Sequence, residues 1–198
     1  MTDHGSSGDE QGAAHLGPAN GIGCLNERSL HAAIKEWLWR PGDRTEVEID
    51  GCYIDLVRGR QLIEIQTTGF GSLRQKLARL LVDHPVLLVH PVPKERWIVT
   101  LAADGQTVLR RRKSPKRGRP IDLFDELVRI PELFLDPNLT LTILMIQEEQ
   151  IRCDDGQGSW RRKGISIVDR RLLEVVETIE FSTPNDLLSL LPDDLECP

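Results

Sequence analysis

The chain has 198 residues and a formal net charge of −6, from 25 Lys and Arg against 31 Asp and Glu. This length allows one large domain, or one domain with an extension, around a substantial core. The longest nearly apolar stretch, "LTLTILMI", is too short to span a bilayer, which excludes a helical membrane span. No zinc-site spacing joins the four cysteines, so a reduced, cytoplasmic protein is the simplest interpretation. These are Cys24, Cys52, Cys153 and Cys197.

The N-terminal part divides into a polar segment and a helix. Residues 1–22 are rich in Gly, Ser, Asp and His, are predicted to be disordered, and show no secretory signal. The stretch "NERSLHAAIKEWLWRPGD" then predicts a helix that Asn26 caps and Pro41-Gly42 ends. Its apolar stripe consists of Leu30, Ala33, Ile34, Trp37 and Leu38.

Residues 46–66, "EVEIDGCYIDLVRGRQLIEIQ", predict three antiparallel strands joined by two tight turns. Asp50-Gly51 favours a type I′ hairpin and Gly59-Arg60 a type II′ hairpin. Pairing outward from these turns aligns acidic side chains on one face, because alternate strand residues face opposite sides. The first row is Glu46, Asp55 and Glu64, and the next is Glu48, Tyr53 and Gln66. The opposite face is predicted to be apolar: Val47, Ile49, Cys52, Ile54, Leu56, Ile63 and Ile65.

Grouped acids need an explanation, because two carboxylates about 4 Å apart repel by roughly 4 kcal/mol at an effective dielectric near 20. A hard divalent cation such as magnesium, which prefers oxygen ligands, would remove that repulsion. A solvated antiparallel face, with acids simply meeting water, is the alternative. The pattern alone leaves both open.

The chain continues with a helix and two strands. The stretch "SLRQKLARLLVDHP" predicts an amphipathic helix, in which leucines alternate with exposed cations at Arg74, Lys76 and Arg79. The buried positions are Leu73, Leu77, Leu80 and Leu81. The stretch "VLLVHPVP" then indicates a buried strand, and "RWIVTLA" a further one.

This order of helix, three-strand meander, helix and strand, with Ile54-Asp55 and Glu64-Ile65-Gln66 in the strands, resembles the PD-(D/E)XK nuclease superfamily. That superfamily includes many restriction endonucleases and Holliday-junction resolvases. The resemblance covers residues 25–102. It implies an α/β restriction endonuclease-like core and a Mg²⁺ ion, for which Mn²⁺ can substitute. Asp55, Glu64 and the carbonyl of Ile65 would hold the metal. Some members add a glutamate from the first helix, for which Glu27 is the candidate, although an acid there also suits the helix dipole.

Two positions depart from the superfamily motif. Ile54 replaces the motif proline, a change that the superfamily tolerates. Gln66 replaces the usual lysine, and glutamine orients water only by hydrogen bonds. Losing such a charge-stabilising group typically costs about 3 to 4 kcal/mol, or 100- to 1,000-fold in rate. Some restriction endonucleases are similar in using glutamine here. Alternatively Arg74 or Lys76 supplies the charge, or both belong to an exposed basic helix face.

The charge is unevenly distributed along the chain. Residues 58–119 carry fourteen cations and four acids, whereas residues 120–198 carry seven cations and seventeen acids. The densest basic piece, "RRRKSPKRGRP" at 110–120, is either a flexible arm along a DNA backbone or a solvated linker. Its candidate DNA-binding residues are Arg110, Arg111, Arg112, Lys113, Lys116 and Arg117.

The predicted organisation is therefore a nuclease-like core at 23–109, a basic segment at 110–120 and a smaller α+β extension at 121–198, weakly resembling a winged helix. Helical turns are expected in "PIDLFDELVRIPELF" and "NDLLSLL", and strands in "LTLTILMIQEEQIRC" and "LLEVVETIEF".

The functional hypothesis is a metal-dependent endonuclease acting on DNA, with Asp55 and Glu64 holding magnesium, Gln66 orienting water and Glu27 completing the set. A degenerate nuclease fold that binds DNA for regulation or assembly is the main alternative. A structural protein with a solvated acidic face is the third. Superfamily members often dimerise, so a homodimer is one implied state.

Overall fold

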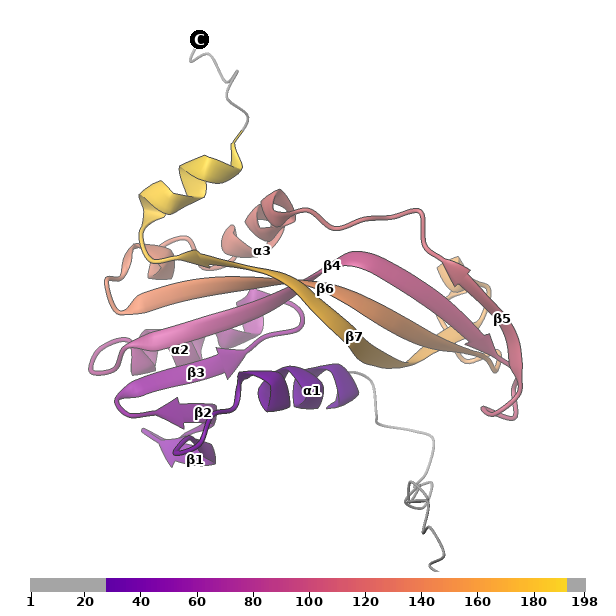
Figure 1. Cartoon of the computed structure of the whole chain (residues 1–198), viewed down its shortest axis with the longest axis horizontal. Helices are drawn as coiled ribbons and strands as arrows, with labels where there is room; N and C mark the ends of the chain where they lie inside the picture. Colours follow the sequence, from indigo (N-terminus) through magenta and orange to yellow (C-terminus); the bar gives the residue numbers. More distant parts are fainter. Residues whose placement is uncertain (1–27, 192–198) are drawn as a thin grey trace, which may run out of the picture.

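One seven-stranded sheet runs through the protein, in the order β1-β2-β3-β4-β6-β7, with β5 beside the far half of β4 (Figure 1). The computed structural model describes residues 28–191. Strands β3, β4 and β6 are parallel, while β1, β2 and β3 form an antiparallel meander and β7 runs antiparallel to β6. The strands are β1 (Arg44–Ile49), β2 (Cys52–Arg58), β3 (Gln61–Ile65), β4 (Val86–Leu101), β5 (Val108–Lys113), β6 (Leu139–Asp154) and β7 (Ile165–Phe181).

The helices are short. The α-helices are α1 (Arg28–Leu38), α2 (Arg74–Leu80) and α3 (Phe124–Leu127). The 3₁₀ helices are η1 (Phe70–Leu73), η2 (Pro120–Leu123), η3 (Leu133–Leu135), η4 (Trp160–Arg162) and η5 (Pro184–Leu190). Across residues 28–191, no helix combines the length and the apolar character needed to cross a membrane. The result is a mixed α/β fold built on a single sheet.

Helices cover both faces of the sheet, so the core has two parts. On one face, Leu30 and Ile34 of α1 pack into a cluster with residues of β2, β3, β4 and β6. On the other face, Leu77 and Leu80 of α2 pack with residues from residue 120 onward, including Leu123. Figure 1 shows α1 and α2 on opposite sides of the strands. The predicted stripes are confirmed except at Trp37, which is half exposed.

The predicted meander and its two turns are confirmed. Both Asp50 and Gly51 have positive φ values, 50° and 71°, as a type I′ turn requires. Gly59 has a φ of 58° at the first position of the second turn. The observed pairs include Glu48 with Tyr53 and Val57 with Leu62, which is the predicted register.

The predicted single row of acids and single apolar face are both wrong in part. Glu46, which has a φ of 51°, pairs with Lys35 of α1, and the same ammonium lies 3.8 Å from Asp55, whereas Glu64 pairs with Lys76 of α2. Ile54 packs in the cluster under α2, whereas Leu56, two residues on, packs under α1. The left-handed backbone at Glu46 interrupts the pairing beside β2 and breaks the simple alternation.

Strand β4 is one continuous strand of 16 residues, where the sequence predicts two. Only residues 86–89 pair with β3 and only residues 97–101 pair with β5. The stretch between them includes Pro91 and Pro93, and a bulge follows Pro93. Proline lacks a backbone N–H, so it is tolerated where one edge of the strand has no ladder partner.

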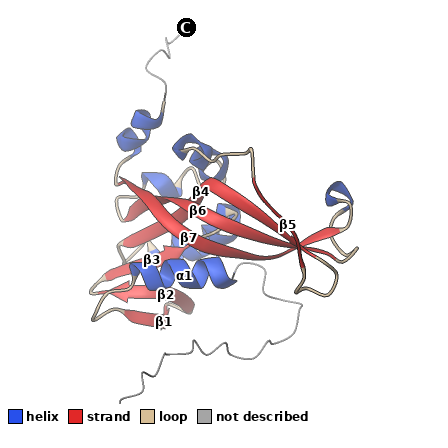
Figure 2. Ribbon diagram, turned by 45° about the vertical axis from the view of Figure 1, so that its right-hand side comes forward, coloured by secondary structure: helices blue, strands red, loops and turns tan. Residues whose placement is uncertain are grey.

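Residues 110–120, the predicted boundary between two parts of the chain, run along an edge of the sheet that both parts share. The predicted basic arm is partly ordered, because residues 110–113 belong to β5, whose side chains are all exposed. Strand β6 of the predicted extension pairs with β4, and β7 pairs with β6, and these strands extend well beyond α1 to end near η4 (Figure 2). This differs from a separate winged-helix-like module, because β6 is apolar on both faces and a place inside the sheet buries both.

Candidate active site

Asp55 lies where β2 and β3 diverge, and its carboxylate joins three elements. Oδ2 accepts a hydrogen bond of 2.8 Å from the backbone N–H of Ile65 on β3. Oδ1 lies 3.1 Å from His31 Nε2 and 3.8 Å from Lys35 Nζ, both on α1. Burial alone would raise the pKa of Asp55, but the bonds from His31 and Ile65 outweigh it and lower the pKa. Asp55 is therefore ionised at neutral pH.

Glu64, on the adjacent strand, is only 4% exposed. Its Oε1 lies 2.6 Å from Lys76 Nζ of α2, and that ammonium also donates to the carbonyl of Tyr53. Burial raises the pKa of Glu64 to about 7, against the opposing effect of Lys76 and with a contribution from the negative charge of Asp55. The alternative interpretation of the sequence pattern, an acidic face exposed to water, therefore does not apply to Glu64.

Gln66 sits at the end of β3, but its side chain is engaged by the following loop. The amide nitrogen donates to the carbonyls of Thr68 and Gly69 and to Ser72 Oγ. The backbone carbonyl of Gln66 accepts a 2.7 Å hydrogen bond from His90 Nδ1. The glutamine amide thus orders the loop after β3 in this structure.

The oxygen atoms of this site suit a hard cation. The three predicted donors are the carboxylates of Asp55 and Glu64, on neighbouring strands, and the carbonyl of Ile65; the Asp55 carboxylate contacts α1, whereas the Glu64 carboxylate contacts Lys76 of α2. A raised carboxyl pKa is expected where neighbouring groups compensate a negative charge incompletely. Within residues 28–191, no group of three or more His, Cys, Asp and Glu side chains is arranged to hold a metal. Glu27, the proposed further ligand, lies outside the described residues.

Of Arg74 and Lys76, the two cations predicted to supply charge, only Lys76 contacts one of the acids, Glu64. Arg74 is more than half exposed and pairs with Glu132, which lies after α3.

The predicted DNA-binding cations lie far from the acids in the sheet. Arg112 pairs in register with Ile98 of β4, and Ile98 pairs with Gln150 of β6, so these residues share a face. On the other face, Arg111 and Lys113 lie over the ring of Trp97. Arg110 is exposed on β5, and Lys116 and Arg117 are exposed in the connection that follows.

Sequence reasoning missed several residues. His31 and Lys35 lie four residues apart, and flank the buried Ile34 on α1, so helical spacing could have indicated that both face the sheet. Arg96 and Arg170, which meet at Glu148, leave no local signal, because they are far apart in the sequence.

Comparisons with other proteins place the chain in a family. The family model described as Domain of unknown function (DUF8091) matches residues 28–182, from the start of α1 to just past β7. An uncharacterized protein of Treponema pallidum (strain Nichols) is 39% identical over 181 residues, which cover 89% of this chain and 72% of that protein. No solved structure matches the chain.

Proposed function

The chain belongs to this family of unknown function, and we propose from the site itself that it is a metal-dependent phosphodiesterase acting on DNA, with a PD-(D/E)XK-like core. The proposal rests first on one observation. Asp55 and Glu64 lie on adjacent strands β2 and β3, close enough that the charge of Asp55 contributes to the raised pKa of Glu64, and Lys76 pairs with Glu64. A carboxylate pair beside an ammonium is the residue set that this chemistry needs.

The strand order supports the same proposal. An antiparallel meander, β1 to β3, is followed by α2 and a parallel strand, β4. This is the order of helix, meander, helix and strand on which the resemblance depends. Asp55 and Glu64 stand at the motif positions of the two strands.

The residues of the proposed site would have separate roles in the reaction. Asp55, Glu64 and the carbonyl of Ile65 would hold magnesium, which when bound activates water and stabilises charge on the phosphate. Lys76 would place a positive charge next to the scissile phosphate. Asp55 stays ionised through its hydrogen bonds from His31 and from the backbone of Ile65.

The far half of the sheet supports a nucleic-acid substrate. Burial is the main cause that lowers the pKa of Arg152. The nearby positive charges of Arg112 and Arg96 lower it further. Clustered arginines on one face provide the local positive potential that phosphate binding requires, despite the net negative charge.

A catalytically degenerate module that binds DNA is the second candidate, and a specific observation favours it. Lys76 pairs with Glu64 and Lys35 lies 3.8 Å from Asp55, so each carboxylate already has a side-chain cation as its neighbour. Gln66, at the motif lysine position, holds a loop instead of facing the acids.

The test is cleavage of supercoiled plasmid and short branched DNA by the purified chain with Mg²⁺ or Mn²⁺. Variants Asp55→Ala and Glu64→Ala are compared with Glu48→Ala, which removes an exposed carboxylate from the neighbouring strand β1. Circular dichroism and thermal melting verify that each variant is folded.

Metal-dependent cutting that both site variants lose and Glu48→Ala retains is the expected result. If no substrate is cut while DNA binds in a salt-sensitive way, the phosphodiesterase is refuted and the binding module takes its place.

A further inference from the structure

A cleft opens at the edge of β4 where the strand has neither β3 nor β5 beside it. Its volume is about 390 Å³, within the range of small-molecule sites. The connection after β5 packs onto this edge, because the backbone N–H of Gly118 donates to the carbonyl of Pro93 at 2.8 Å. A Cβ at Gly118 would lie 2.7 Å from Val92 Cγ1 and 2.8 Å from Pro93 O, so a glycine is required for this approach. The cleft is thus a built feature of the sheet edge.

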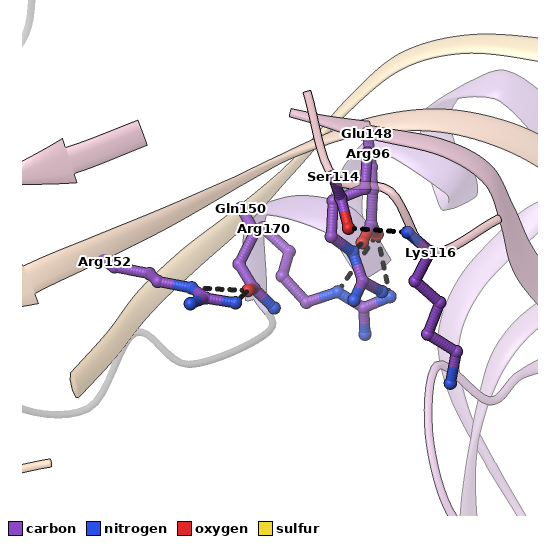
Figure 3. A network of polar contacts seen from close by, with 7 residues as sticks. All are labelled: Arg96, Ser114, Lys116, Glu148, Gln150, Arg152 and Arg170. Atoms are coloured by element: carbon purple, nitrogen blue, oxygen red, sulfur yellow. Dashed lines mark hydrogen bonds and ion pairs between the residues drawn. The ribbon is translucent and has the colours of Figure 1, made fainter. Parts of the chain in front are cut away.

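One wall of the cleft carries a preorganised pair of arginines. Arg96 of β4 and Arg170 of β7 both bind Glu148 of β6, a carboxylate with no exposed surface. Arg170 donates from Nε and Nη2 to Oε2, at 3.1 and 2.8 Å, while Arg96 Nε binds Oε1. Figure 3 shows the two guanidinium groups converging on this carboxylate, with Lys116 beside them. Glu148 therefore positions both guanidiniums at the cleft.

The cations of this wall suit a phosphate monoester. Arg96, Arg170 and Lys116 line the cleft, and the two guanidinium groups share one carboxylate, Glu148. A phosphate monoester carries about −1.5 to −2 at pH 7, whereas a carboxylate carries a single charge. Arginine forks also bind phosphate oxygens in pairs.

Other lining groups accept hydrogen bonds. Asp122, Asp125 and Glu126 form what we call the acidic wall, and His90 of β4 also lines the cleft. Burial lowers the pKa of His90, and its Nδ1 donates to the carbonyl of Gln66, so the neutral ring leaves Nε2 as an acceptor. These carboxylates would repel a bare phosphate ion but would accept hydrogen bonds from hydroxyl or amino groups.

We propose that this cleft binds an organic phosphate monoester, with the phosphate on Arg96, Arg170 and Lys116 and the hydroxyl or amino groups of the organic part on the acidic wall. Nucleotides, sugar phosphates and the phosphorylated end of a DNA strand share this chemistry. The site is separate from Asp55 and Glu64, and does not depend on the proposed phosphodiesterase.

The experiment is calorimetric titration of the full chain in metal-free buffer. The probes are the four deoxynucleoside 5′-monophosphates, ribose 5-phosphate, and an oligonucleotide with and without a 5′-phosphate. Inorganic phosphate and unphosphorylated deoxynucleosides are the negative probes. At least one organic phosphate is expected to bind 10-fold or more tightly than both negative probes, and the tightest probe identifies the source.

Three variants test the two walls. Arg96→Gln is expected to weaken binding at least 10-fold, and Asp125→Asn to weaken organic phosphates without weakening inorganic phosphate. Arg171→Gln is the matched control, since Arg171 is next to Arg170 on β7 but 60% exposed and paired with Asp169. Asp55→Ala is included and should bind normally, which keeps this test apart from any failure of DNA cleavage.

Any of three results would overturn the proposal. The folded protein could bind none of the phosphate probes, Arg96→Gln could bind as tightly as the wild type, or the unphosphorylated deoxynucleosides could bind as well as the monophosphates. Either of the first two results would show that the cationic side chains do not bind phosphate. The third would show that the phosphate group does not contribute to binding.

Discussion

Replacing Glu148 by glutamine should destabilise the fold strongly, because this carboxylate binds the guanidinium groups of both Arg96 and Arg170. It is fully buried and accepts three charge-assisted hydrogen bonds. Glutamine keeps the shape but offers one acceptor oxygen and one NH₂ group, which would face a guanidinium donor. Two cations would then lie close together without their anion.

The magnitude follows from the burial of the partners. Removing one member of a buried ion pair costs about 3 to 5 kcal/mol, because it leaves uncompensated charge. The Arg96 side chain keeps about a quarter of its exposure and Arg170 about a tenth, so water relieves part of that penalty. We expect a loss of about 3 kcal/mol in the free energy of unfolding, which for a chain of this size lowers the Tm by about 6 to 12 °C.

The assay is urea denaturation followed by tryptophan fluorescence and circular dichroism, with thermal melting as a second measure. Glu149→Gln is the matched control: Glu149 is the next residue of β6 and pairs with the exposed Arg111 at 2.9 Å. It should lose less than about 1 kcal/mol, as surface ion pairs do. Equal losses in the two variants, or no loss for Glu148→Gln, would refute the assignment of Glu148 as a buried electrostatic centre.

The remaining predictions concern the candidate site, the pH dependence and the core. If the chain cleaves DNA, Lys76→Met should reduce the rate by about 100- to 1,000-fold, because it removes the charge beside Glu64, whereas Arg74→Met should change it less than about 3-fold. Hydrogen bonds from Arg58 hold the pKa of Asp43 below its ordinary value, so this pair stabilises the fold above about pH 4, the pKa in the unfolded chain, and the contribution is lost as the pH falls through the lower folded pKa. Asp43→Asn should therefore flatten the acid limb of a stability–pH curve measured by urea denaturation. Leu30→Ala, at a fully buried position of α1, should lower the free energy of unfolding by about 2 to 5 kcal/mol in the same assay.

Each of these predictions has a result that contradicts it. Equal rates for Lys76→Met and the wild type would show that the ammonium takes no part in cleavage. An unchanged acid limb in Asp43→Asn would assign acid unfolding to other carboxylates. A loss below about 1 kcal/mol for Leu30→Ala would mean that α1 is not anchored by this side chain.

The sequence by itself determined the local elements. Asp50-Gly51 and Gly59-Arg60 specify their turns because few residues adopt positive φ, and these turns in turn define which residues of β1, β2 and β3 lie opposite each other. The helical spacing of apolar residues likewise predicted α1 and α2, because this spacing depends only on neighbours along the chain. The placement of Asp55 and Glu64 on adjacent strands follows from this local geometry.

Only the tertiary structure decided how the distant parts meet. The junction of β4 with β6 makes one sheet from both halves, and brings Arg96, Glu148 and Arg170 together from three strands. Packing on both faces likewise selected Lys76 over Arg74 as the cation beside Glu64. These contacts join residues that are far apart in the sequence. Which of the contacts form depends on how charge and apolar surface are buried, and no short stretch of sequence encodes that burial.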